Sequence, residues 1–143
     1  MEPKITASTL RKSILTVPGM DCWREVEELF PDSQDNIRLD WQLPGIASVA
    51  VGGDYTTVSP AMAALACVQV SIILVDDMLD EEPEGAHHRF GIGRTANLAL
   101  ALQAAGAVLI DQCKVAAPNR AAAAHALNRM ALAYPVVLIA FAL

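Results

Sequence analysis

Residues 71–94 read SIILVDDMLDEEPEGAHHRFGIGR, and the interpretation of the rest of the chain depends on them. The segment Tyr55–Val75 contains no charged residue and leads directly into Asp76, Asp77 and Asp80. If this segment is a helix, spacings of three and four residues place the three carboxylates on one face at its C-terminal end. Like charges one turn apart repel each other, and the negative end of the helix dipole adds to the repulsion.

A bound cation would offset this repulsion. Carboxylate oxygens are hard ligands that suit Mg²⁺ or a similar ion. The alternative is a solvated acidic helix end that binds nothing. Because the acidic motif follows a charge-free segment directly, we favour a magnesium site over that alternative.

Residues 1–143 are expected to form a single domain, because a chain of this length seldom divides further. Hydrophobic residues make up 54% of the chain and charged residues 18%, which predicts a large core and argues against disorder. The formal net charge of −6 argues against a nucleic-acid partner, because phosphate binding requires a basic surface.

The cysteines indicate a reducing compartment. Cys22, Cys67 and Cys113 are odd in number and widely spaced, unlike a disulfide framework or a zinc knuckle. Residues 1–20 lack the apolar core of a signal peptide. Both observations predict a cytoplasmic protein.

Two apolar segments are candidates for membrane spans. Residues 58–75 are interrupted by serine, proline and glutamine, and residues 130–143 are shorter than the roughly 20 residues that a spanning helix needs. We expect both to be buried helices, with no stable membrane span. Residues 134–143 end within an apolar pattern, with no glycine or polar tail. We expect a homo- or hetero-oligomeric partner, or a missing C-terminal half, to cover this segment.

Capping residues, proline and glycine predict three helices up to the acidic motif. The expected helices cover residues 21–30 with Asp21 as N-cap, residues 43–51 with Pro44 in the first turn, and about 60–80 with Ser59 as N-cap.

Residues 81–93 are expected to form a loop, because they contain one proline and three glycines. Thr95 is expected to cap a helix that ends near Cys113, and Pro118 to open a further helix in which Pro135 imposes a kink or a break. The sequence has no alternating strand pattern with hairpin turns. The predicted fold class is all-α, a bundle of long antiparallel helices.

Two stretches resemble the trans-isoprenyl diphosphate synthases, or polyprenyl synthetases. They are PAMAALACVQVSIILVDDMLD at 60–80 and GIGRTANLALALQAAGAVLI at 91–110, and the resemblance covers about residues 40–113. It implies the N-terminal part of the all-α class I isoprenoid synthase fold. It also implies that Asp76, Asp77 and Asp80 bind Mg²⁺, which holds the diphosphate of an allylic prenyl diphosphate for catalysis.

The chain departs from the family where the second substrate binds. Family members carry Lys and Arg, which bind isopentenyl diphosphate, at the positions of Asp40 and Trp41, and a His at the position of Gln69. The family's second aspartate-rich motif is absent, because after Glu84 the only acidic residue is Asp111.

The loop after the motif carries the candidate diphosphate-binding cations. The family often has Arg-Arg-Gly here, so the resemblance assigns diphosphate contacts to Arg89 and, as the weaker candidate, His88. The alternative is a surface arginine on a solvated loop. His87 and His88 have no cysteine or third histidine nearby, which argues against zinc, and His125 is expected to be a packed or surface residue.

Three hypotheses follow from the sequence. The first is a magnesium-dependent isoprenoid synthase that ionises an allylic diphosphate and then cyclises it, as terpene cyclases do, or transfers it to an unusual acceptor. The second is a non-catalytic or regulatory subunit of a prenyl diphosphate synthase. The third is an unrelated helical bundle that binds an apolar ligand or a membrane surface.

Overall fold

The structure is a computed structural model that describes the backbone of residues 5–32 and 37–142 and the side chains of 5–32 and 37–133. Throughout these residues the regular secondary structure is helical, which confirms the predicted all-α class. The elements are α1 (Ala7–Leu15), the 3₁₀ helix η1 (Met20–Cys22), α2 (Glu25–Leu29), α3 (Leu39–Ala50), α4 (Tyr55–Leu79), α5 (His87–Phe90), α6 (Ile92–Asp111) and α7 (Ala117–Ala142).

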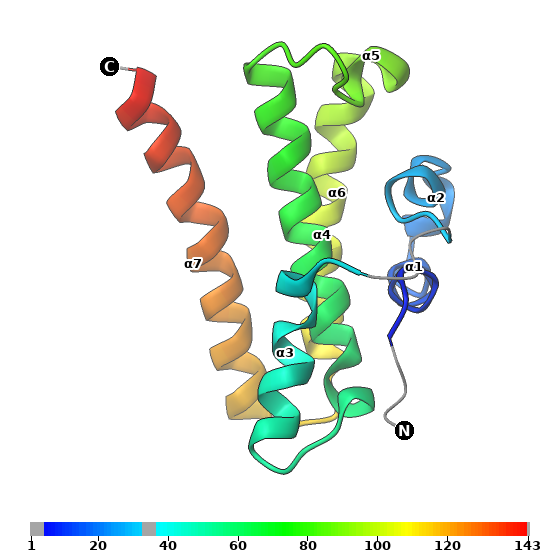
Figure 1. Cartoon of the computed structure of the whole chain (residues 1–143), viewed down its shortest axis with the longest axis vertical. Coiled ribbons are helices and arrows are strands. Elements are labelled where there is room, and N and C mark those ends of the chain that lie inside the picture. Colours follow the sequence, from blue (N-terminus) through cyan, green and yellow to red (C-terminus); the bar gives the residue numbers. More distant parts are fainter. Residues whose placement is uncertain (1–4, 33–36, 143) are drawn as a thin grey trace.

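Helix α4 forms the centre of the bundle (Figure 1). α6 packs along one side of it, and α3 covers its N-terminal half (Figure 1). The long helices α3, α4, α6 and α7 alternate in direction along the chain, as predicted for an antiparallel bundle (Figure 1). The core contains these fully buried large side chains: Leu10, Ile14, Val26, Phe30, Met62, Cys67, Leu98, Leu102 and Leu109.

Small residues let α4 and α6 approach each other closely. A methyl group on Gly106 of α6 would lie 3.0 Å from Cγ2 of Val68 and 3.3 Å from the carbonyl oxygen of Ala64, both on α4. A larger side chain at position 106 would therefore push the two helices apart.

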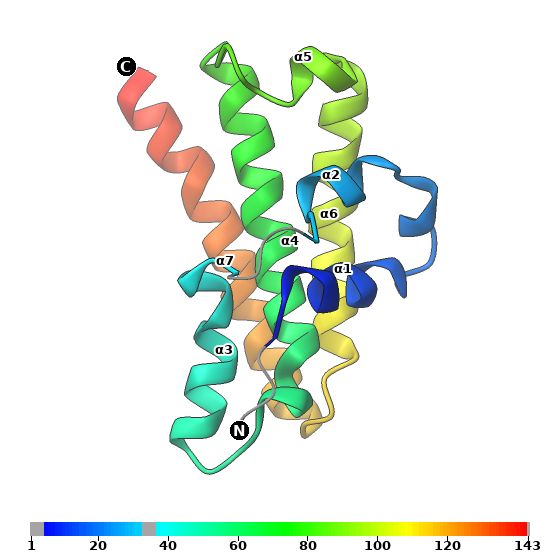
Figure 2. The same cartoon turned by 45° about the vertical axis from the view of Figure 1, so that its right-hand side comes forward.

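The segment from α1 to α2 lies across α4 and α6 (Figure 2). It is anchored by apolar side chains that are fully buried, among them Leu10 and Ile14 of α1 and Phe30 after α2. The rings of Phe30 and Trp41 have centroids 5.7 Å apart, so this segment also packs on α3.

Helix α7 is close to the bundle only near its N-terminal end. Ala124 and Leu127 pack against the core, and the helix then diverges from α4 (Figure 1). α7 runs past Pro135 to Ala142, so of the kink or break expected at this proline, the break is wrong. Side chains 134–143 lie outside the described part, and so does the expectation of how they are covered.

The predicted start of α4 is wrong. The helix begins at Tyr55, and Asp54 rather than Ser59 is its N-cap. The Asp54 carboxylate accepts hydrogen bonds from the backbone N–H of Thr57 at 2.9 Å and from its hydroxyl at 2.8 Å. Because this cap satisfies free N–H groups of the first turn, the helix extends upstream and leaves Pro60 inside it.

Other borders also differ from the prediction. The single helix expected over 21–30 is replaced by η1 and α2, which follow a turn at Gly19, whose φ is +90°. Asp21, the expected N-cap, makes no side-chain capping bond. α3 begins at Leu39, four residues earlier than predicted, with Pro44 in its interior. The expected loop 81–93 contains α5, and Thr95 lies inside α6, where its hydroxyl donates to the carbonyl of Gly91 at 2.8 Å.

Asp54→Ala is expected to lower the melting temperature by a few degrees at neutral pH, because the α4 cap is lost. Hydrogen bonds from Thr56 and Thr57 lower the pKa of Asp54 from 3.8 to about 2. A carboxylate with a lowered pKa stabilises the fold above its unfolded-state pKa, and this contribution is lost as the pH falls through the folded-state value. The difference between wild type and variant should therefore shrink between about pH 4 and pH 2.

Circular dichroism melts at several pH values test this expectation, with Asp21→Ala as the control. Asp21 is exposed and its carboxylate has no hydrogen bond to the described residues. Equal decreases in melting temperature in Asp54→Ala and Asp21→Ala would contradict the assignment of Asp54 as the cap. So would a difference between wild type and Asp54→Ala that does not change with pH.

Within the described part of the chain, two helices, α4 and α6, are long and apolar enough to cross a membrane. They are also the two helices that pack most extensively on each other, and about half of the most apolar window of α4 is buried within the protein. Core helices of folded domains commonly meet the same criteria, so this finding is weak evidence for a span.

Candidate functional site

The acidic motif lies at the C-terminal end of α4. Asp76 and Asp77 belong to the last turn and are half-buried, and Asp80 is the exposed C-cap. The N–H of Asp80 donates to the carbonyl of Asp76, and the N–H of Glu82 to that of Asp77, both at 2.9 Å. Glu81 lies between them with a φ of +52°, in the left-handed region. This pattern is a Schellman-type ending, so the turn that carries the aspartates is well defined.

Asp76 and Asp80 share a face of α4 with one apolar and one polar residue below them. Gln69, Ile73, Asp76 and Asp80 follow one another at spacings of four, three and four residues. Gln69 is where this face meets α3, because the Trp41 indole N–H donates to its Oε1 at 2.7 Å. α3 begins at this level and covers only the part of α4 that precedes Gln69 (Figure 1). Ile73, one turn further along α4, is 39% exposed. The two carboxylates thus lie on the same face as a partly exposed isoleucine.

The three carboxylates are free to bind a ligand. Within the described part of the chain they form no hydrogen bond and no ion pair through their side chains. In the same part, no three His, Cys, Asp or Glu side chains converge closely enough to form a complete metal site. Mg²⁺ is commonly held by one or two carboxylates, with phosphate oxygens and water completing its octahedron. The donor set therefore fits Mg²⁺ together with a phosphorylated ligand.

The structure does not bring Arg89 together with the aspartates. Its Nε donates to Oε1 of Glu28 on α2 at 2.5 Å, and its guanidinium lies 5.4 Å from the centroid of the Phe90 ring. α2 lies beside α6, on the side away from α7 (Figure 1). The predicted diphosphate cation is thus paired with a carboxylate that is distant in sequence.

The two histidines of the loop differ in environment. His88 is exposed, and its Nε2 lies 3.0 Å from the carbonyl oxygen of Glu82. His87 is buried, its ring centroid is 4.1 Å from that of His88, and its Nδ1 has no partner among the described residues. His125 is exposed on α7, one of the two placements expected for it. The burial of His87 has no signal in the sequence.

An arginine not singled out from the sequence lies at the start of α3. Nη2 of Arg38 is 3.1 Å from Oδ2 of Asp40, and hydrogen bonds from Arg38 and, to a lesser extent, Gln69 lower the pKa of Asp40. Trp41 is buried and bonded to Gln69. Arg38 is two residues before Asp40, a position where the family resemblance expects a basic residue. This proximity is the sequence feature that could have identified Arg38.

An apolar groove borders this polar network. It is a shallow depression, open to solvent and lined by Arg38, Leu39, Asp40 and Leu43. Leu39, Leu43 and Ile46 recur at spacings of four and three residues and are 41–71% exposed. The outer face of α3 therefore carries an exposed apolar stripe.

Comparisons of the chain with protein-family models, with curated proteins and with solved structures gave no match.

Proposed function

We propose that the C-terminal end of α4 is a magnesium-dependent site for the diphosphate of an allylic prenyl diphosphate. The observation that carries this proposal is the placement of Asp76, Asp77 and Asp80. Three carboxylates without protein partners among the described residues lie at the end of α4, two of them on the same face as the partly exposed Ile73. A ligand with an anionic head and a long apolar tail fits such a surface.

The proposed reaction begins with ionisation of the allylic carbon–oxygen bond. Asp76, Asp77 and Asp80 would hold Mg²⁺, which when bound neutralises the charge of the diphosphate leaving group. Ile73 and the exposed apolar side chains of α3 would contact the prenyl tail. The class I isoprenoid synthase fold is proposed on the same grounds, as the finer description of an all-α bundle.

The environment of α3 bears on the acceptor. Asp40 is engaged by Arg38, and Trp41 is buried against Gln69, so this network offers no free pair of cations to a second diphosphate. This arrangement favours cyclisation or an acceptor other than isopentenyl diphosphate. The second carboxylate cluster that family members use would have to come from residues outside these 143.

A non-catalytic or regulatory subunit is the alternative proposal. The observation that favours it is that no three potential ligands converge on a metal position in the described part. An oligomer is part of both proposals and is supported by exposed apolar residues on α6, where Leu100 is 66% and Val108 is 41% exposed. Cytoplasmic location remains a prediction.

A thermal shift assay tests the proposed site. A non-hydrolysable allylic thiolodiphosphate at about 100 times its Kd should raise the melting temperature by roughly 5–10 °C when Mg²⁺ is present. The analogue without Mg²⁺, and the corresponding prenyl alcohol with Mg²⁺, should have little effect. An equal shift with the alcohol would favour the third hypothesis, an apolar-ligand bundle without a diphosphate site.

A further inference from the structure

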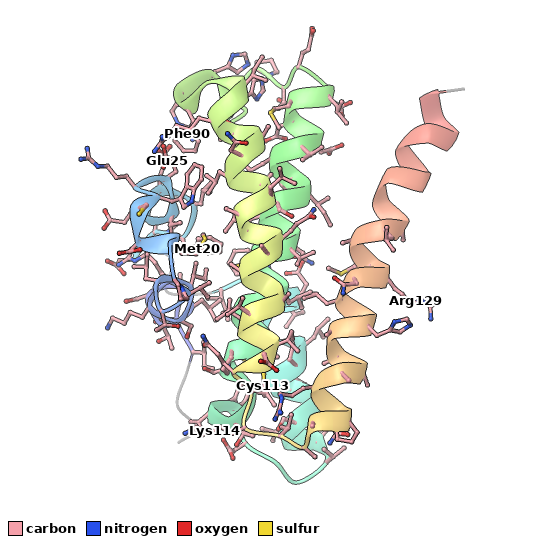
Figure 3. The ribbon with its side chains drawn as sticks, turned by 180° about the vertical axis from the view of Figure 1, so that it is seen from behind. Met20, Glu25, Phe90, Cys113, Lys114 and Arg129 are labelled. Carbon is pink, nitrogen blue, oxygen red and sulfur yellow. The ribbon has the colours of Figure 1, made fainter. Side chains whose placement is uncertain are left out.

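Two ion pairs connect α2 to the corner between α5 and α6. Glu25 and Glu28 are three residues apart on α2 and pair with Arg94 and Arg89, respectively. The arginines lie on either side of Gly91, whose φ of +86° turns the chain from α5 into α6. Figure 3 labels two residues of this corner, Glu25 on α2 and Phe90 at the end of α5.

The two pairs differ in strength. Both carboxylate oxygens of Glu25 accept hydrogen bonds from Arg94, through Nε and through Nη2. The side chain of Glu25 is 10% exposed, and the Arg94 guanidinium lies 5.1 Å from the Trp23 ring centroid. The hydrogen bond from Arg94 also lowers the pKa of Glu25. The Arg94 side chain is 51% exposed and that of Arg89 52%, so what distinguishes this pair is its two hydrogen bonds and the burial of Glu25, and we treat it as the anchor.

The pair between Glu28 and Arg89 is exchangeable. It uses a single hydrogen bond from Nε of Arg89, and both side chains are about half exposed. The Nη groups of Arg89 have no partner among the described residues. An exposed single-bond ion pair contributes little net free energy, so another anion competes with it readily.

The element that carries Arg89 is small. α5 has four residues and is followed by Gly91, and the buried Nδ1 of His87 lacks a partner within the described part. An unsatisfied buried polar atom lowers the local stability of the segment that contains it. We therefore expect α5 to be the element that shifts when Arg89 exchanges partners.

We propose that Glu28 is an intramolecular competitor of the diphosphate, holding Arg89 on α2 until an anionic ligand displaces it. The identity of the ligand rests on the function proposed above. Glu25 and Arg94 keep α2 in place during the exchange. Arg89 then becomes available to a diphosphate oxygen, which its two Nη groups suit.

Calorimetric titration with inorganic pyrophosphate and Mg²⁺ tests the exchange in the full chain. Glu28→Gln should bind pyrophosphate about two to five times more tightly than wild type, because no carboxylate competes for Arg89. Glu27→Gln makes the same change in net charge on the same helix. Glu27 is exposed and has no ion pair among the described residues, so this variant should bind as wild type does. In the Arg89→Gln background, Glu28→Gln should have no effect.

A second measurement does not depend on the ligand. The rate at which phenylglyoxal modifies Arg89, followed by mass spectrometry, should rise in Glu28→Gln and stay unchanged in Glu27→Gln. Equal rates of Arg89 modification in wild type and Glu28→Gln would contradict the ion pair between Glu28 and Arg89. Equal pyrophosphate affinities of these two proteins would overturn the competition and leave the diphosphate site standing. If no variant binds pyrophosphate, the proposed function fails and the competition fails with it.

Discussion

Phe30→Ala is expected to lower the free energy of unfolding by about 3–5 kcal/mol, the range for removing a buried aromatic ring. Phe30 is fully buried, and its ring packs on Trp41. It joins the segment that contains α1 and α2 to the start of α3. Its backbone carbonyl also accepts a hydrogen bond from Nη1 of Arg11 at 3.2 Å, which the substitution leaves in place. The loss should therefore report on ring packing.

Urea unfolding followed by circular dichroism measures this loss. The control is Leu132→Ala on α7, because Leu132 is 70% exposed and its removal should change stability by less than about 0.5 kcal/mol. A loss for Phe30→Ala below about 1 kcal/mol would show that the N-terminal segment is not packed on the bundle as described.

Asp76→Ala is expected to weaken magnesium-dependent binding of an allylic diphosphate analogue at least about 100-fold. Removing an outer-shell partner of a metal ligand already costs 10–100-fold, and Asp76 is proposed as a direct ligand. The same substitution removes one of several like charges from the negative end of the α4 dipole. The melting temperature of the ligand-free variant should therefore stay the same or rise.

Asp111→Ala is the matched control for this variant. Asp111 is also an aspartate at the C-terminal end of a long helix, but its side chain lies 3.5 Å from Arg120 and is remote in sequence from the acidic motif. The Asp111→Ala variant should bind the analogue as tightly as wild type does. A lower melting temperature for Asp76→Ala would indicate a structural role for this carboxylate.

The main helices follow from the sequence, because capping residues, proline and glycine indicate α4 and α6, and the charge-free segment before Asp76 supports α4. Their borders were less predictable. Ser59 and Pro60 form a good helix start, yet the helix begins at the Asp54 cap upstream, which accepts three hydrogen bonds, and Pro60 lies inside the helix. A sequence containing two start signals does not say which of them dominates.

The candidate site was predictable only where it is local in sequence. The spacing of Asp76 and Asp80 correctly places them on one face at the end of α4. The pairing of Arg89 with Glu28 joins residues 61 positions apart, and the bond between Trp41 and Gln69 joins residues 28 apart. Such pairs depend on how helices pack, and no local pattern encodes them.

Isothermal titration of the non-hydrolysable allylic diphosphate analogue, with and without Mg²⁺, on wild type and Asp76→Ala tests the central claim most directly. Binding that requires both Mg²⁺ and Asp76 is the predicted result. Absence of binding by the folded wild-type chain, or equal binding by the two proteins in Mg²⁺, would contradict a magnesium–diphosphate site at the end of α4.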